Sequence, residues 1–448
     1  MNLNFKLILF SAAIFITFQV SAQNGNSPYS VLGLGDISSP GYIRNMAMGG
    51  TGVSNGNPEF INIQNPALLH INKFQNLDST IQFTLLEAGF YGQLRRLSTQ
   101  STTQITNGFN INYLSFAFPI SKRLTSSIGL RPYSYMQNRY VATLNNEQVK
   151  DRNIISAVND YSINGSLNQV HFASGLDISK KFSIGLLASY IFGNITEQSV
   201  TQALLMQDGS FSANTGSNIH TYYSGLQLKP GISFRTVLKD SLNNASGTFF
   251  NAGFTVDYLT NFTGERSLKL ISKNNYDAIN TLSDTVNSTY KLTIPPTSSF
   301  GISLDRPDDW TIALDFNYAP WSYFNSFPNS YAKTQMNNSY TIALGGEIKP
   351  AKTKSLMNKE YRVGISYTKS PITVNNIQLD DYALTFGASF PLGRKDGRFK
   401  SKPLTKINAA MVVGNRGTTQ GGLIREQYFR IHLGVLIHDK WFQRWRIE

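Results

Sequence analysis

The five histidines are the side chains best suited to catalysis or metal binding in this chain of 448 residues, which contains no cysteine. No two of them stand at a metal-binding spacing; they are His70, His171, His220, His432 and His438. A hydrolase would need a serine and an orienting polar group beside one of them, and the sequence does not bring such groups together. No phosphate-binding loop, dinucleotide fingerprint or calcium loop occurs. We therefore expect no enzyme activity, no metal and no cofactor, with a hydrolase as the weaker alternative.

The composition restricts the class of protein. Charged residues make up 15% of the chain, against about 25% in ordinary soluble domains, while aromatic residues reach 12%. Past the N-terminus there is no run of about 20 apolar residues, which excludes a polytopic helical membrane protein. The lack of cysteine excludes a disulfide scaffold and a cysteine-anchored lipoprotein. An all-β chain remains, in water or in an outer membrane.

Residues 1–22 are typical of a cleaved signal peptide. Lys6 provides the basic start, an apolar run extends from Leu7 to Val20, and the small residues Ser21 and Ala22 follow. A membrane anchor is the alternative, but the run is too short to span a bilayer comfortably. We therefore predict export, with the folded chain beginning after Ala22.

From about residue 79 onward, apolar and polar residues alternate, which predicts β-strands. Trp310, Ile312 and Leu314, for example, alternate with Thr311 and Ala313. Fourteen candidate strands follow this pattern, at about 79–92, 107–119, 123–138, 160–177, 182–193, 219–236, 247–260, 288–304, 309–320, 338–349, 360–369, 381–391, 403–414 and 424–438.

The aromatic residues and the connections favour a membrane barrel over a sandwich. Tyr340, Tyr361 and Trp310 begin apolar stripes, where rings suit the headgroup level of a bilayer. Tight, basic connections alternate along the chain with a set that includes the longest ones, 139–159, 194–218, 261–287 and 321–337. Outer-membrane barrels have this asymmetry, with long external loops and short periplasmic turns. We predict an all-β fold, a transmembrane antiparallel β-barrel of about fourteen strands over residues 79–438, with a basic aromatic periplasmic tail over 439–448.

Positive charge gathers at the predicted periplasmic side. The chain carries 40 basic and 27 acidic residues, a net charge of +13. The basic positions of interest are Lys349, Lys352, Lys354, Lys359, Arg394 and Lys395. The simplest interpretation is a rim that faces anionic lipid headgroups, and the alternative is a docking surface for an acidic periplasmic protein. Because these residues lie in turns of an exported barrel, we do not expect nucleic acid as a partner.

Residues 23–78 do not alternate and are rich in Gly, Asn, Ser and Pro. Three stretches stand out here, at 27–36, 44–53 and 62–69, with the sequences SPYSVLGLGD, RNMAMGGTGV and NIQNPALL. Together with the chain end GVLIHDKWF at 434–442, they resemble the FadL/OMPP1/TodX family of outer-membrane transport proteins, in the form common among Bacteroidetes-type bacteria, PorV-like barrels included. The resemblance implies a fourteen-stranded barrel whose N-terminal segment, 23–78, forms a hatch in the lumen.

The motif residues have a physical interpretation of their own. Gly49, Gly50 and Gly52 permit positive φ and close backbone approach. Asn65-Pro66 favours an extended or turn geometry at Asn65, and Ala67 follows. These six residues are our candidates for gating the lumen, and a tight turn that leads into the first strand is the structural alternative.

The resemblance also implies a function, which is passage of hydrophobic, fatty-acid-like molecules from an external groove to a lumenal pocket and out through a gap in the wall. One long loop carries an aromatic cluster that would suit a hydrophobic ligand, a protein partner or the outer leaflet, namely Trp321, Tyr323, Phe324, Phe327 and Tyr331. The alternative function is a non-transporting barrel subunit of a larger outer-membrane export or barrel-assembly complex, as in type IX secretion. The expected partners are outer-membrane lipid, a hydrophobic ligand, and outer-membrane or periplasmic proteins.

Overall fold

The computed structural model describes most of the chain from residue 27 to residue 440. The described residues are 27–39, 41–71, 73–76, 79–145, 154–205, 214–239, 247–273, 279–281, 286–307, 309–325, 336–350, 359–392 and 405–440. The predicted signal peptide, 1–22, and the tail beyond residue 440 lie outside them.

The elements follow one another in this order: η1 (Pro28–Val31), β1 (Asp36–Ile37), α2 (Ile43–Ala47), η2 (Pro66–Ile71), β2 (Lys73–Asn76), β3 (Ser79–Ser98), β4 (Thr103–Pro119), β5 (Leu124–Asn145), β6 (Ile154–Asp177), β7 (Phe182–Leu205), β8 (Asn214–Lys239), β9 (Thr248–Lys273), β10 (Ile279–Thr281), β11 (Val286–Lys291), β12 (Thr297–Arg306), β13 (Trp310–Ala319), η3 (Trp321–Tyr323), β14 (Ser339–Ile348), β15 (Glu360–Val374), β16 (Ile377–Leu392), β17 (Thr405–Arg416), η4 (Gln420–Gly422) and β18 (Arg425–Lys440). None of the described helices is long and apolar enough to cross a bilayer.

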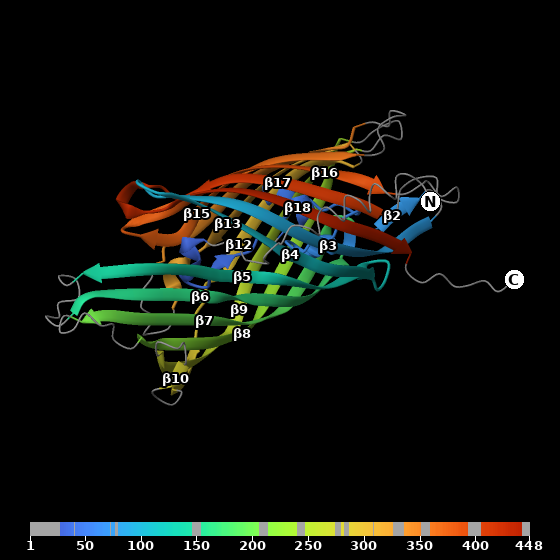
Figure 1. Cartoon of the computed structure of the whole chain (residues 1–448). Helices are drawn as coiled ribbons and strands as arrows, with labels where there is room; N and C mark the ends of the chain where they lie inside the picture. The colour runs from blue at the N-terminus through green and yellow to red at the C-terminus, as the bar shows by residue number, and fades with distance from the viewer. Residues whose placement is uncertain are drawn as a thin grey trace, which may run out of the picture.

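Fourteen strands form a closed antiparallel barrel, which confirms the predicted fold class (Figure 1). They are β3 to β9 and β12 to β18, each paired with the next. Closure comes from β18, which pairs with β3 from Arg425 opposite Ser98 to Lys440 opposite Phe83. The short strand β11 pairs with β9 and continues the line of β12 beyond the break at 292–296.

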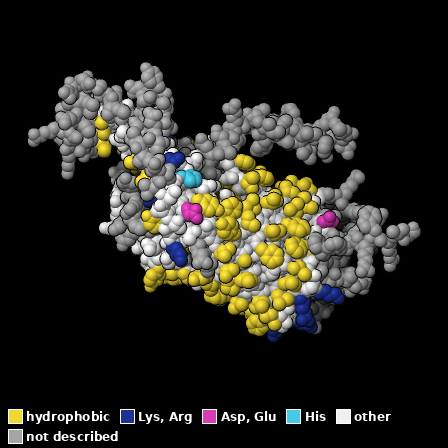
Figure 2. Space-filling view, turned by 90° about the horizontal axis from the view of Figure 1, so that it is seen from below, with side chains coloured by type: hydrophobic (Ala, Val, Ile, Leu, Met, Phe, Trp, Pro, Cys, Tyr) yellow, Lys and Arg dark blue, Asp and Glu magenta, His cyan; other side chains and the backbone are white. Residues whose placement is uncertain are grey.

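The wall is apolar outside and polar inside. On β13, Ile312 and Leu314 are 53% and 42% exposed, whereas the alternate residues Ala313 and Asp315 are only 1% exposed. Figure 2 shows the result on one face, a broad band of hydrophobic side chains over the strands. This arrangement suits a wall that faces lipid, because lipid solvates apolar side chains and the closed sheet pairs its own backbone groups.

Aromatic rings mark the edge of the apolar band. Tyr340, Tyr367 and Tyr382 lie side by side on β14, β15 and β16, with ring centroids 5.9 and 4.9 Å apart. Rings with a polar end favour the boundary between lipid and water, so the tyrosines indicate where the headgroups begin.

Several wall strands extend further than predicted, β5 to β9 among them. The predicted loop 139–159 is wrong in large part, because β5 ends at Asn145 and β6 begins at Ile154, and the predicted loops 194–218 and 261–287 are likewise mostly strand. Inside this end of the barrel, Ile163, Ile195 and Phe262 belong to one buried apolar cluster that holds the long strands together. Outside it the strands no longer face lipid, so the alternation that marks a membrane strand fades.

Candidate functional site

The N-terminal segment lies against the inner face of the wall. We call residues 27–39 and 41–71 the inner segment. Its strand β1 pairs with β5, with Asp36 opposite Tyr135 and Ile37 opposite Ser134. Its helices α2 and η2 contact opposite parts of the wall, β15 to β18 and β5 to β8 respectively. Most of its side chains are buried, and Thr51, Asn65 and Ala67 are fully so. The inner segment therefore crosses the lumen from one side to the other.

A belt of wall glycines makes room for the inner segment. These glycines point inward, and a Cβ added to each would collide with an inner-segment residue; they are Gly185, Gly231, Gly253, Gly301, Gly345, Gly364 and Gly387. At Gly364 the added atom would come 2.1 Å from the backbone nitrogen of Gly49, and at Gly253 it would come 2.0 Å from the carbonyl oxygen of Val53. The wall and the inner segment thus fit backbone to backbone, closer than any side chain allows.

The Gly49–Gly52 motif is fixed by wall side chains. Gly49 and Gly50 have φ angles of +70° and +93°, the left-handed region that favours glycine. The Gly49 N–H donates to Thr385 Oγ1 at 2.9 Å. The N–H groups of Gly52 and Val53 both donate to Asp315 Oδ2, at 2.7 and 2.9 Å. Gly52 serves close approach instead of positive φ, since a Cβ there would lie 1.8 Å from Gln64 Oε1.

Asn65 joins the second motif to both the inner segment and the wall. Its Nδ2 donates to the carbonyls of Val53, at 2.7 Å, and Ile232 on β8, at 3.0 Å. Its Oδ1 accepts the Ala67 N–H at 3.0 Å, which starts the short helix η2 at Pro66. Asn65 thus holds a turn inside the lumen. Its amide nitrogen donates two hydrogen bonds and its amide oxygen accepts one.

A buried ion network ties the inner segment to β14, β15 and β17. Glu347 accepts from Arg44 Nε at 2.9 Å and from Arg362 Nε at 2.6 Å. Further along, Lys406 bonds to Glu360 at 2.8 Å and to Glu59 of the inner segment. The side chains involved are at most 6% exposed.

The ring of Phe60 lies at the centre of this network. The charged groups of Arg44, Arg362 and Lys406 stand 5.7, 4.9 and 5.1 Å from the ring centroid. Each cation therefore has both a carboxylate and an aromatic face, which compensates for the loss of water. Because Arg44, Glu59 and Phe60 come from the inner segment and the others from the wall, the network joins the two, and we call it the latch.

A second group of charges holds the start of the inner segment at the other end of the lumen. Asp36 bonds to Arg416 at 3.0 Å and to Arg95 at 3.4 Å. Burial acts to raise the pKa of Asp36, but the nearby Arg416 and Arg95 outweigh it and hold that pKa below its usual range. The Ser27 hydroxyl donates to Glu426 at 2.5 Å. The two groups of charges thus hold the inner segment toward both ends of the lumen.

The barrel wall has an open seam between β4 and β5. The two strands pair only from Pro119 opposite Thr125 to Leu114 opposite Leu130. Over the remaining described lengths, 103–113 of β4 and 131–145 of β5, no pairing joins them, apart from the two residues of β1 that lie against β5. Two irregularities mark the point where the strands part, an extra residue at Asn112 and a register shift beside Pro132.

Proline explains why the seam begins there. Pro132 has no N–H to give to β4, and the bulge beside it turns β5 away. Both strands keep their outer partners, β3 and β6, so the wall parts locally without unravelling.

A lumenal cavity of about 540 Å³ reaches this seam. Asn112 of β4 and Arg131, Tyr133 and Tyr135 of β5 line it on the seam side. Gly49 and Gly50 line it from the inner segment, and Trp321 lines it as well. A molecule in the cavity would therefore meet the glycine motif and the opening between β4 and β5.

The predicted external aromatic cluster is divided. Trp321 is only 8% exposed and packs on Phe324 inside the barrel, with ring centroids 5.5 Å apart. Tyr323 is 73% exposed. Phe327 and Tyr331 lie outside the described residues. Of the cluster, the structure thus places Trp321 and Phe324 together, facing inward.

The predicted basic rim is described only at two positions. Lys349 approaches Glu360 at 3.7 Å, at the edge of the ion network, and Lys359 lies 5.8 Å from the Phe390 ring. The remaining four, Lys352, Lys354, Arg394 and Lys395, lie outside the described residues. In the described part of the chain, no group of acidic and histidine side chains is arranged to hold a metal ion.

Comparison with known proteins gives the family. A family model described as BamG matches residues 4–448. The chain belongs to the BamG family. No curated protein matches this chain.

Several solved structures share the fold of this BamG-family chain. A Pseudomonas aeruginosa FadL homologue is 12% identical with a TM-score of 0.57, over 91% of this chain and 98% of that one. The Pseudomonas putida toluene transporter TodX is 14% identical with a TM-score of 0.54, over 91% and 99%. The Ralstonia pickettii toluene transporter TbuX is 12% identical with a TM-score of 0.53, over 90% and 99%. At these identities the likeness establishes the barrel fold.

Proposed function

We propose that this protein is an outer-membrane channel for small hydrophobic, fatty-acid-like molecules, which move between the lumenal cavity and the membrane through the β4–β5 seam. The observation that carries the proposal is the seam itself, because unpaired strand edges in a membrane wall are costly unless they border a path or a partner. The cavity that reaches the seam supports it, and so do the structures of similar fold that are described as hydrocarbon and toluene transporters.

The inner segment is the hatch of this channel. It blocks the straight path along the barrel axis, so a molecule that enters must turn sideways toward the seam. The latch around Phe60 and the bonds from Gly49 and Gly52 to the wall hold the hatch in place. Export by a cleaved signal peptide over residues 1–22 would bring the chain to the outer membrane.

Uptake by cells tests this proposal. Pro132→Thr restores a backbone N–H two residues beyond Leu130, where the β4–β5 pairing ends, and should extend that pairing. The expected result is that uptake of a radiolabelled long-chain fatty acid falls several-fold compared with the unaltered channel. Pro391→Thr, on β16 away from the seam, is the matched control and should leave uptake unchanged. Equal uptake by all three proteins would contradict passage through the seam.

The same seam favours a second candidate, a subunit of a larger outer-membrane export or barrel-assembly complex. Free strand edges are templates for an added strand, so a partner's strand could complete the wall. Purification in mild detergent would then recover a stoichiometric partner, and a monodisperse single barrel would count against it. Reversal of Lys349, Lys352, Lys354 and Lys359 to Glu should weaken the association if the basic rim is the docking surface.

A further inference from the structure

The outer wall carries a hollow apart from the lumen and the seam. It has a volume of about 810 Å³, within the range of roughly 300–1,000 Å³ typical of ligand pockets. It extends across β14 to β18 and β3 and ends at Ile105 of β4. The hollow lies in the half of the wall near the β3–β4 turn, where the tyrosines mark the lipid boundary.

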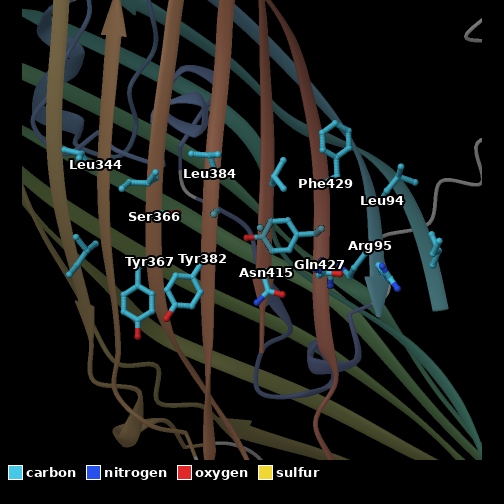
Figure 3. Close-up of a pocket in the computed structure, with 18 residues that line it drawn as sticks. Leu94, Arg95, Leu344, Ser366, Tyr367, Tyr382, Leu384, Asn415, Gln427 and Phe429 are labelled. Carbon is cyan, nitrogen blue, oxygen red and sulfur yellow. The ribbon is translucent and has the colours of Figure 1, made fainter. Parts of the chain in front are cut away.

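Two rows of side chains line the hollow, one polar and one apolar (Figure 3). The polar row consists of direct cross-strand neighbours, in the order Arg96, Gln427, Asn415, Tyr382 and Tyr367. The apolar row lies two residues further along each strand, in the order Leu94, Phe429, Val413, Leu384 and Ile365. Residues two apart on a strand share a face, so the hydrogen-bond donors lie beside the apolar row on the outer face of the wall. We call the apolar row the floor of the hollow.

One end of the polar row is positively charged. Arg96 is the cation of the row, and Arg425, two residues before Gln427 on the same face of β18, stands beside the hollow; both are exposed. Over the described part of the chain, neither forms an ion pair. An arginine on the lipid face costs little near the membrane interface and more toward the middle of the bilayer. We therefore place Arg96 and Arg425 at the interface, at the depth of the lipid headgroups. The guanidinium fork matches phosphate oxygens, and the amides and hydroxyls beside it add further donors.

We propose that this hollow binds a phosphorylated, multiply acylated saccharolipid of the outer leaflet, the lipid A part of lipopolysaccharide. Its phosphates bond to Arg96 and Arg425, its sugars to the amides and tyrosines, and its acyl chains fill the apolar floor. The polar row crosses five strands, about 19 Å at a strand spacing of about 4.8 Å, which suits a disaccharide headgroup better than a single phosphate. The choice of the outer leaflet rests on the outer-membrane location proposed above and on the predicted orientation, in which the β3–β4 turn lies at the external end together with the connection in 139–159.

Native mass spectrometry of the purified full-length barrel tests the proposal, with lipid A, phosphatidylglycerol and phosphatidylcholine added in separate samples. We expect retention of lipid A over both phospholipids. The double substitution Arg96→Gln and Arg425→Gln should reduce it by about tenfold. Val413→Trp, which fills the floor, should reduce it without altering the charge.

Matched controls lie outside the hollow. Lys269→Gln removes an exposed cation of β9, and Val170→Trp enlarges a lipid-facing valine of β6. Both should retain lipid A like the unaltered barrel. Equal retention by the Arg96/Arg425 variant, or equal retention of phosphatidylglycerol, would overturn the proposal. Since binding is measured on the purified barrel, a channel that passes no fatty acid can still bind lipid A, so the two proposals fail separately.

Discussion

At the residue scale, single wall side chains hold the inner segment by bonds to its backbone. Asp315 is 1% exposed, and one of its oxygens accepts two N–H groups of the glycine motif. Asp315 lies between Leu314 and Phe316, which face outward, so its carboxylate points into the lumen. That alternation is the signal by which the sequence could have located this residue.

Asp315→Ala should therefore loosen the inner segment. The buried N–H groups of Gly52 and Val53 would lose their acceptor, at about 1–3 kcal/mol for each unsatisfied group. We expect a lower unfolding temperature in the heat-shift assay of the folded barrel. Asp309→Asn, at the exposed pair with Arg306, is the control and should change little. An unaltered melting curve for Asp315→Ala would contradict its role.

Glu347→Gln tests the latch. The substitution leaves the buried guanidinium groups of Arg44 and Arg362 facing a neutral amide, a loss on the order of 3–5 kcal/mol for a broken buried pair. If the inner segment gates the lumen, we expect greater leakage of a hydrophobic dye from proteoliposomes, because the inner segment is released from β14 and β15. A barrel that is destabilised but no leakier would show that the network supports the fold without gating the lumen.

At the scale of elements, the fit between the inner segment and the glycine belt depends on missing side chains. Gly364→Ala places a methyl group 2.1 Å from the Gly49 nitrogen, and the backbone on both sides must shift. Gly346→Ala, on the neighbouring strand, meets nothing closer than 3.9 Å. We expect protease to cut the inner segment readily in Gly364→Ala and not in Gly346→Ala. Equal protection in both would mean that the belt does not hold the inner segment.

The strands and the hatch motifs differ in how far the sequence predicts them. The alternation of Trp310, Ile312 and Leu314 predicts β13, because lipid imposes one pattern on every outward face. The long ends of β5 to β9 escape prediction, since water and the lumen impose no such pattern there. The latch also escapes, because Arg44 and Glu347 are 303 residues apart and only barrel closure brings them together.

At the scale of the whole molecule, the most extended gap in the pairing of the barrel wall is the seam between β4 and β5. The wall's fourteen pairs of neighbouring strands, the closure of β18 on β3 included, contain one long unpaired stretch among the described residues, between β4 and β5. The cavity lies in the lumen beside that seam, and the inner segment and the apolar cluster around Phe262 lie in the lumen as well. Under the proposed function, hydrophobic molecules leave the lumen sideways through this seam.

Photolabelling tests that claim most directly. A photoreactive long-chain fatty acid is added to the full-length barrel in proteoliposomes, and the labelled peptides are identified by mass spectrometry. We expect labels on the seam residues of the cavity, Asn112, Tyr133 and Tyr135, and on Gly49–Gly50, which line the same cavity. Labels confined to the outward apolar band, with none at the seam or the inner segment, would contradict it.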